Sequence, residues 1–251
     1  MRIKLEAVTL DAIADSETVE SAFRNVVDCA GRFGIDLVSY HRFDPLQVRP
    51  GVPRHSQFEL LSSGFPEDWV QRYLDSDYRL IDPITGLSAC LVRPILWSSV
   101  PSRTQLTPAQ SAYMDDLFSW LAPGDGLAVP LFGPNGQHGY AGMGWRQAGL
   151  DWDSSEVRVI QAVAESFHLR VCELTLEERG HIPTLTGTQE RLLRALAGGH
   201  PDAMICGMVN LRPEALQTAI ARLLGTLGVS DRPSALIRAE ALGLIDRRLR
   251  A

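Results

Sequence analysis

Four side chains in one stretch of the chain could together bind a small amphiphilic molecule. Trp69 and Tyr73 are four residues apart, so they would share one face of the short helix predicted over Pro66–Tyr73. Asp82 and Trp97 follow them. An indole N–H can donate to a carbonyl oxygen, a carboxylate can accept from an amide N–H, and the rings can cover an apolar chain. Taken alone, these residues also fit an aromatic core beside an Asp-Pro turn.

A second pattern, near the C-terminus, is typical of a DNA-binding motif. Predicted helices over Pro201–Val209 and Pro213–Leu227, joined by the turn Asn210–Arg212, have helix-turn-helix spacing. Residues 183–251 hold 9 basic and 6 acidic groups, whereas residues 1–182 hold 15 and 24. A mildly basic segment on an acidic body fits a nucleic-acid module joined to another domain, and chance could also produce it.

Hydrophobic periodicity predicts the elements that would position these residues. The helices predicted in the first part of the chain are Thr18–Phe33, Pro66–Tyr73, Thr107–Trp120 and Ser154–Glu178. The predicted strands are Asp36–Arg42, Gln57–Ser62, Gly126–Phe132 and His138–Trp145. A loop is expected at Pro45–Pro53, and Asn135-Gly136 is a strong hairpin signal.

After a break at Arg179–Pro183, the patterns predict helices alone. These helices are Gly187–Ala197, Pro201–Val209, Pro213–Leu227 and Pro233–Leu244. The chain is therefore expected to form an α/β sandwich followed by a small helical domain.

The composition excludes several classes of protein. With 251 residues, 45% hydrophobic and 22% charged, the chain is typical of folded globular proteins. It has no apolar run of the roughly 18–20 residues that a membrane helix needs, and Met1–Ile13 lacks the apolar stretch of a signal peptide. We therefore expect a cytoplasmic protein that does not associate with membranes. The four cysteines lie far apart, without metal-ligand spacing, which predicts thiols in a reducing compartment.

An enzyme is the least supported class. Nucleophile-elbow, P-loop, zinc-protease and kinase motifs are absent from the sequence. The six histidines are scattered, and the glycine-rich segment Gly139–Gly144 does not fit a dinucleotide-binding fingerprint. We expect no catalytic residues, no metal site and no cofactor.

Both patterns resemble the LuxR-type quorum-sensing transcriptional regulators. The residues that stand in the order and spacing of that family's autoinducer-binding domain are Trp69, Tyr73, Asp82, Pro83, Trp97 and Gly126. This resemblance covers roughly Thr18–Glu178. The residues similar to the family's helix-turn-helix are Leu185-Thr186, Gly199 and Leu227-Gly228-Val229, within Leu185 to about Ile245.

The resemblance implies an α+β architecture in two domains. The first, residues 1–178, would be an α/β/α sandwich with a central antiparallel sheet that binds the autoinducer and dimerises. A linker over 179–184 would join it to a four-helix helix-turn-helix domain over 185–251. The implied partners are an acyl-homoserine lactone, a double-stranded DNA operator and a second copy of the chain. The helix Ser154–Glu178 would help to form the dimer, although its single apolar stripe equally fits burial against its own sheet.

The resemblance also implies a role for each matched residue. Trp69 would bond the lactone carbonyl and Asp82 the amide N–H of an acyl-homoserine lactone, while Tyr73 and Trp97 would pack on its headgroup. The further ligand-binding positions are Phe65, Ile84 and Gly142.

Those three further positions lack hydroxyl groups that some receptors have. Such receptors carry Tyr where Phe65 stands, Thr near Ile84, and Ser or Thr near Gly142. Each missing hydrogen bond to a buried carbonyl could cost about 1 kcal/mol of affinity or more, and Gly142 is expected to open space. We therefore expect an acyl chain different from the commonest ones, or a ligand dependence that is weak or absent.

The predicted recognition helix departs further from the family. Ala215–Ala219 and Ala221 replace a common Thr-Val-Lys-x-His and a following Arg, and Gln189 replaces a usual Glu in an earlier helix. Phosphate neutralisation by Lys and Arg supplies most non-specific DNA affinity. The candidate DNA contacts that remain are Arg212, Gln217, Thr218, Arg222 and Arg232, of which Gln217 either reads an adenine edge or is solvated. The alternative function is therefore a regulator that acts without ligand, or an anti-activator that forms a heterodimer with a DNA-binding relative.

Overall fold

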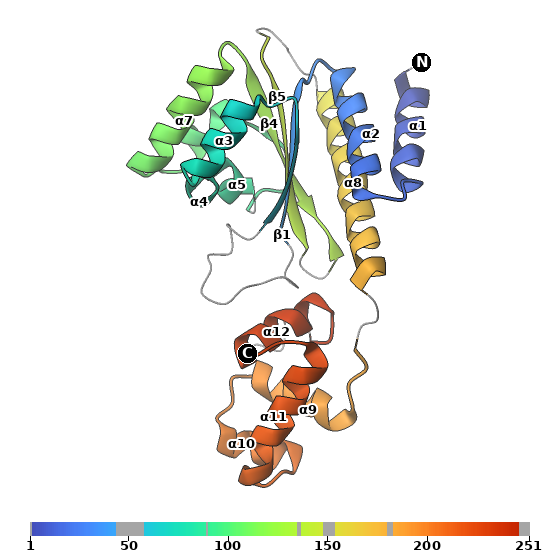
Figure 1. Cartoon of the computed structure of the whole chain (residues 1–251), viewed down its shortest axis with the longest axis vertical. Helices are drawn as coiled ribbons and strands as arrows, with labels where there is room; N and C mark the ends of the chain where they lie inside the picture. The colour runs from blue at the N-terminus through green and yellow to red at the C-terminus, as the bar shows by residue number, and fades with distance from the viewer. Residues whose placement is uncertain are drawn as a thin grey trace. The chain divides into compact units, whose positions relative to one another are not determined.

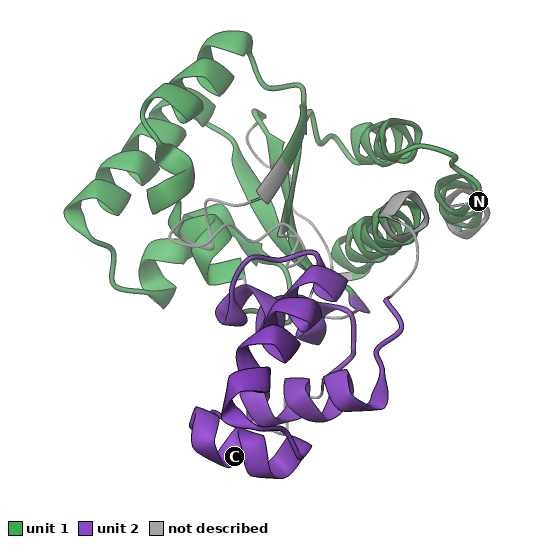
Figure 2. Ribbon diagram, turned by 60° about the horizontal axis from the view of Figure 1, so that its bottom comes forward, with its two compact units in different colours: residues 1–43, 53–133, 137–178 green, residues 44–52, 134–136, 179–251 purple. Residues whose placement is uncertain are grey.

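The computed structural model describes residues 2–43, 58–88, 90–134, 137–147, 154–179 and 183–245. The chain divides into two compact units (Figure 2). The first consists of Met1–Phe43, Pro53–Gly133 and Gln137–Glu178, and Arg179–Ala251 makes up most of the second. The predicted loop Pro45–Pro53 and the hairpin turn Asn135-Gly136 lie outside the described residues.

A five-stranded antiparallel sheet forms the centre of the first unit (Figure 1). Its strand order is β2-β1-β5-β4-β3. The strands are β1 (Leu37–Phe43), β2 (Phe58–Ser63), β3 (Ile95–Leu96), β4 (Asp125–Phe132) and β5 (His138–Trp145). Four of them agree with the predicted strands to within a residue or so at the ends that the structure describes. The sequence did not predict β3, because two residues are too few to show an alternating pattern.

Helices cover both faces of this sheet, so the predicted α/β/α sandwich is confirmed (Figure 1). One face carries α1 (Arg2–Ala14), α2 (Val19–Gly31) and α8 (Ser154–Arg179). The other carries α3 (Glu67–Asp75), α4 (Tyr78–Ile81), α5 (Pro83–Ser88) and α7 (Pro108–Leu121). A short 3-10 turn, η3 (Trp97–Ser99), and α6 (Val100–Arg103) follow β3. The helices α1, α4, α5 and α6 were not predicted from the sequence.

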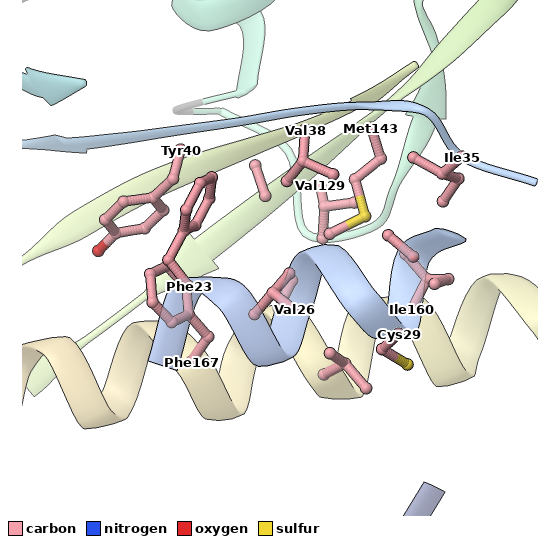
Figure 3. Close-up of a cluster of buried hydrophobic side chains, with 14 of the residues drawn as sticks. Phe23, Val26, Cys29, Ile35, Val38, Tyr40, Val129, Met143, Ile160 and Phe167 are labelled. Atoms are coloured by element: carbon pink, nitrogen blue, oxygen red, sulfur yellow. The ribbon is translucent and has the colours of Figure 1, made fainter. Parts of the chain in front are cut away.

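Side chains alternate between the two faces of the sheet along each strand, so the buried residues form two separate hydrophobic clusters, one on each face. Val38, Tyr40 and Met143 point toward α2 and α8, where Tyr40 packs edge-on against Phe167 with ring centroids 4.7 Å apart (Figure 3). The neighbouring residues of the same strands, such as Leu37, face α3, α5 and α7 and belong to a separate cluster. Each large apolar side chain buried in this way stabilises the fold by about 1.5–3 kcal/mol.

Local signals set the ends of the long helices. Thr18 and Ser21 form a capping box at the start of α2, and Thr107 does the same with Gln110 at α7. Gly34 has a φ of +78°, which lets the chain turn out of α2 so that the Ile35 N–H bonds back to the Ala30 carbonyl at 3.2 Å. That turn leads directly into β1.

The second unit has four described helices, α9 (Gly187–Ala197), α10 (Asp202–Val209), α11 (Pro213–Leu227) and α12 (Arg232–Ala241), around its own core. Asn210, with a φ of 54°, ends α10 and makes the tight turn into α11, a left-handed conformation that Asn tolerates better than most residues. Gly228, with a φ of 64°, ends α11. The last helix ends at Ala241 rather than at the predicted Leu244, because Gly243 (φ 68°) reverses the chain and Leu244 N–H bonds to the Ala239 carbonyl.

Gln189, which replaces a usual Glu, makes the contacts of a capping residue. Its side-chain oxygen accepts from the Thr186 N–H at 2.9 Å, and its own N–H donates to Thr186 Oγ1 at 3.3 Å. Its amide nitrogen also donates to Thr226 Oγ1 at 2.7 Å, which ties the start of α9 to the end of α11. This departure from the family pattern therefore preserves the helix start.

Across the described ranges, no helix combines the length and apolar character needed to cross a membrane. The same residues contain no cluster of His, Cys, Asp or Glu side chains suited to a metal ion. All four cysteines are thiols, three of them buried.

Candidate ligand pocket and helix-turn-helix surface

A cavity with about 520 Å³ of empty space, part of it open to solvent, lies in the first unit. The helical wall of the cavity is lined by Phe65, Trp69, Val70, Tyr73, Asp82, Ile84, Trp97, Tyr113 and Leu117. The sheet wall is lined by Ser39, His41, Leu60, Ser62 and Tyr140. The two walls come from segments distant in the sequence.

Asp82 is a buried carboxylate held in place by four donors. Its Oδ1 accepts from the backbone N–H groups of Ile84 at 2.8 Å and Thr85 at 3.4 Å. Its Oδ2 accepts from the hydroxyls of Thr85 at 2.8 Å and Tyr73 at 3.1 Å. Burial raises the pKa of this carboxyl, and the four hydrogen bonds oppose the rise because they favour the charged form. Asp82 thus presents an oriented acceptor to the cavity and also caps the start of α5.

Three buried tyrosines surround Asp82. Burial raises the pKa of Tyr73, Tyr113 and Tyr140 well above the ordinary value, and the nearby charge of Asp82 raises each further. These phenols therefore remain protonated at physiological pH and can donate hydrogen bonds.

Stacked rings fix the orientation of Trp69. Its indole lies nearly parallel to that of Trp120, with centroids 4.8 Å apart and an interplanar angle of 14°. Phe65 also stacks on Trp120, at 6.0 Å and 15°. Such stacking contributes about 0.5–1.5 kcal/mol per pair beyond area burial. Trp120 was not a predicted site residue. It positions Trp69 and Phe65, which were predicted.

Trp97 lies against a floor made of three glycines, Gly126, Gly142 and Gly144. A Cβ added at Gly126 would overlap the indole carbons Cδ2 and Cε3, and one at Gly144 would lie 3.1 Å from Cη2 and Cζ3. The register pairs Gly126 with Gly144 across β4 and β5. Glycine is required at Gly126 because the ring approaches the backbone so closely, and Gly144 leaves little room for a side chain. The indole is 3% exposed, and its N–H has no hydrogen-bond acceptor among the described residues, although it lies near enough to the Tyr140 hydroxyl to lower that group's pKa.

Gly142 does not open space in the pocket, so that expectation was wrong. A Cβ at residue 142 would lie 2.5 Å from Ser39 Oγ and 2.6 Å from the Tyr140 hydroxyl oxygen. Ser39 is the direct cross-strand partner of Gly142 in β1. Two hydroxyls therefore fill the position that a side chain on residue 142 would occupy.

The structure brings six of the seven predicted ligand-binding residues around the one cavity: Phe65, Trp69, Tyr73, Asp82, Ile84 and Trp97. Gly142 is not among the residues that line the cavity. The cavity also has lining residues that the sequence did not predict: Ser39, His41 and Tyr140 of the sheet wall, and Tyr113 on α7. Alternation in β1 could have placed Ser39 and His41 on one face, but only the pairing of β1 with β5 shows which face meets the helices.

The predicted DNA contacts lie on or beside α11. Arg212, Thr218 and Arg222 are exposed. Gln217 is exposed too, and its amide nitrogen donates to Asp202 Oδ2 at 3.2 Å. Arg232 forms a two-point ion pair with the same carboxylate, at 2.7 and 3.0 Å, and this bonding holds the pKa of Asp202 below its usual value. Two of the five candidates are thus engaged by an acidic residue within the unit.

Comparison with known proteins decides the family. The family model for the autoinducer binding domain matches residues 18–171. The chain belongs to the LuxR-type quorum-sensing regulators. The resemblance drawn from Trp69, Asp82 and Trp97 is therefore confirmed at the level of the family.

Relatives of this LuxR-type chain are transcriptional regulators. The HTH-type transcriptional regulator y4qH of Sinorhizobium fredii is 26% identical over 183 residues, which is 72% of this chain and 56% of that protein. This chain therefore spans little more than half the length of that relative. The transcriptional activator protein AnoR of Acinetobacter nosocomialis is 22% identical over 94% of this chain and 97% of its own length. The quorum sensing-dependent regulator RpaR of Rhodopseudomonas palustris is 24% identical over 74% of each chain.

Solved structures of LuxR-type proteins share the fold. Escherichia coli SdiA superposes with a TM-score of 0.70 over 98% of this chain and 100% of its own, at 17% identity. SdiA in complex with octanoyl-rac-glycerol gives a TM-score of 0.68 over 95% of this chain and 94% of that one, at 16% identity. The predicted α+β architecture with a C-terminal helical domain is thus confirmed.

Proposed function

We propose that this protein is a quorum-sensing transcriptional regulator that binds an acyl-homoserine lactone in the first unit and operator DNA through the second. In this proposal residues 1–178 form the autoinducer-binding and dimerisation domain, 179–184 the linker and 185–251 the DNA-binding domain. The protein acts as a homodimer in the cytoplasm, where its operator is. The observation that carries the proposal is the convergence of six predicted ligand-binding residues on one cavity.

Asp82 and Trp69 hold the polar headgroup in this proposal. Asp82 already accepts four hydrogen bonds and still borders the cavity, so a ligand amide N–H would meet a fixed acceptor. The Trp69 indole donates to the lactone carbonyl, with its orientation fixed by Trp120. Tyr73 and Trp97 cover the lactone ring, and Phe65 and Ile84 border the acyl chain. In this proposal the lactone is bound intact and the protein uses no cofactor.

Ligand binding acts through linkage with folding and dimerisation. The acyl chain would fill space between the sheet and α3, α5 and α7, and so would complete the core of that side. A ligand that binds only the folded, dimer-competent state raises the population of that state. The same ligand then raises the concentration of a two-fold dimer that matches a palindromic operator.

A thermal-shift titration against acyl-homoserine lactones of increasing chain length tests this function. At about a hundred times its dissociation constant, a ligand should add roughly 2.7 kcal/mol to the free energy of unfolding. Asp82→Asn and Trp69→Phe should lose most of that shift. Asp116→Asn is the matched control, because Asp116 is paired with Arg72 and Tyr78 and does not line the cavity. Stable wild-type protein that no lactone shifts would contradict ligand binding.

The alternative, a heterodimeric anti-activator or a ligand-independent regulator, is favoured by one observation. Asp202 places a carboxylate beside Gln217 and pairs with Arg232, which reduces the positive charge available to phosphate. A gel-shift assay with ligand-loaded wild-type protein and the DNA upstream of its gene distinguishes the two. Binding by the chain alone supports the homodimeric DNA-binding function, and binding that requires a second LuxR-type protein supports the alternative.

A further inference from the structure

The two walls of the cavity offer a ligand different hydrogen-bonding groups: the helical wall offers an acceptor and the sheet wall offers donors. The inference drawn from this difference rests on the proposed function. The helical wall contributes Asp82, an acceptor whose oxygens are already oriented by Ile84 N–H and the Thr85 and Tyr73 hydroxyls. The sheet wall contributes two buried hydroxyls, on Ser39 and Tyr140, which can donate.

An amide group bound by Asp82 must point its carbonyl oxygen away from that residue. In a trans amide the N–H and C=O bonds are antiparallel and lie in one plane. If the N–H donates to Asp82 in the helical wall, the carbonyl oxygen faces the sheet wall. A buried carbonyl oxygen that finds no donor there would lose a hydrogen bond that it makes in water.

The sheet wall has donors gathered at one point. Ser39 Oγ and the Tyr140 hydroxyl oxygen lie 2.5 and 2.6 Å from the position of a Cβ on residue 142. The Trp97 carbon Cζ2, on the same edge of the indole as its N–H, lies 3.1 Å from that position. That N–H is buried and has no acceptor among the described residues. Two hydroxyls and one unsatisfied donor thus surround the place where some receptors carry a Ser or Thr side chain.

We propose that Ser39 and Tyr140 donate hydrogen bonds to the amide carbonyl oxygen of the bound acyl-homoserine lactone and are specificity-determining residues of this pocket. They restore from two neighbouring strands the hydroxyl that Gly142 lacks. Gly142 is then needed because a side chain there would displace both donors. Trp97 supplies the third donor at this point and is held flat by Gly126 and Gly144.

Single-oxygen variants of the full chain test the assignment. The probes are the acyl-homoserine lactone that binds wild-type protein most tightly and its thioamide, whose sulfur is a weak hydrogen-bond acceptor. Ser39→Ala and Tyr140→Phe should each weaken lactone binding about 3- to 10-fold, as expected for one lost hydrogen bond. Ser16→Ala is the matched control, because Ser16 is a buried serine of the same unit whose hydroxyl donates to the Ala12 carbonyl and does not line the cavity. The wild type should prefer the amide over the thioamide, and the Ser39→Ala/Tyr140→Phe double variant should lose most of that preference.

Moving the hydroxyl to residue 142 provides a rescue. Gly142→Ser alone should bind poorly, because its Cβ collides with both oxygens. In the double variant those oxygens are gone, so adding Gly142→Ser should recover affinity.

The outcomes separate this inference from the function on which it rests. Affinities within two-fold of wild type for Ser39→Ala and Tyr140→Phe, or an unchanged amide preference in the double variant, would overturn the assignment while lactone binding stands. If wild-type protein binds no lactone, the proposed function fails and this inference fails with it. Unliganded melting temperatures show whether each variant is folded, and either single variant suffices for the test.

Discussion

The glycine floor under Trp97 gives the sharpest test of how this side of the sheet is packed. Gly126→Ala would place a methyl group closer than 3.0 Å to the indole carbons Cδ2 and Cε3. Ordinary contact begins near 3.4 Å, so the ring must shift by at least about 0.4 Å, or the two strands must separate. Trp97 is 3% exposed, and the one open space it borders is the cavity, so a displaced ring would narrow the space for a ligand. Overpacking of this kind costs about 1–3 kcal/mol.

Two other glycines make the prediction quantitative. Gly144→Ala meets the ring and Leu37 at 3.1–3.2 Å, which a small adjustment can relieve, so its cost should be smaller. Gly31→Ala, at the end of α2, meets nothing within 4 Å and should stabilise the helix by about 0.5–1 kcal/mol. The expected order of stability is Gly31→Ala, wild type, Gly144→Ala and then Gly126→Ala.

Tryptophan fluorescence is suited to the measurement because all five tryptophans precede residue 179. Thermal unfolding followed in this way reports on the first unit. At roughly 2–4 °C per kcal/mol for a unit of this size, Gly126→Ala should lower the midpoint by about 2–12 °C, and it should also weaken ligand binding because Trp97 is displaced. A Gly126→Ala midpoint equal to that of wild type, or a Gly144→Ala variant less stable than Gly126→Ala, would refute the reasoning.

Two further predictions concern acid stability and the charge around α11. Burial lowers the pKa of His41 to about 3 and of His168 to about 4, so between pH 6.5 and these values the unfolded chain binds protons that the folded chain does not. Urea denaturation should therefore show that the free energy of unfolding is lower at pH 5 than at pH 7 by about 2 kcal/mol per histidine. Asp82 acts in the opposite sense, and only as the pH falls through its raised pKa. His168→Asn should show about half the pH dependence, and a flat profile in wild type would be inconsistent with neutral buried histidines. Asp202→Asn should release Arg232 and Gln217, tighten non-specific DNA binding and steepen the dependence of log K on log salt concentration by about one unit. Glu190→Gln, which changes the net charge equally but lies beside Arg194 on α9, is the control, and equal effects of the two variants would show that the Asp202 contacts do not matter.

The long elements were predictable because their signals are local. The helix over α2 has apolar residues at regular spacing between a capping Thr18 and a terminating Gly34, and both its ends follow from those residues. The helix α1 was missed because its apolar residues do not define one face: Val8 is 64% exposed whereas Ile13 is fully buried. The helices α4 and α5 have 4 and 6 residues, too few to show a helical period.

The candidate site was predictable only in part, for a related reason. Trp69, Tyr73 and Asp82 lie close together in the sequence and carry a recognisable order. Ser39 and Tyr140 are about a hundred residues apart, and their meeting above Gly142 depends on the register between β1 and β5. Sequence patterns show that a strand has two faces, and the register decides which residues become neighbours.

Asp82 caps α5 with the same carboxylate that borders the cavity, and these two roles limit which substitutions this position can accept. A substitution of Asp82 would weaken the start of α5 and also remove a hydrogen-bond acceptor, so it would have two separate costs. Ser39 and Tyr140 cap nothing, and their hydroxyls can be exchanged without disturbing a helix start. In the proposed function, new ligand preferences can therefore arise through changes on the strands while the contacts to the headgroup stay the same.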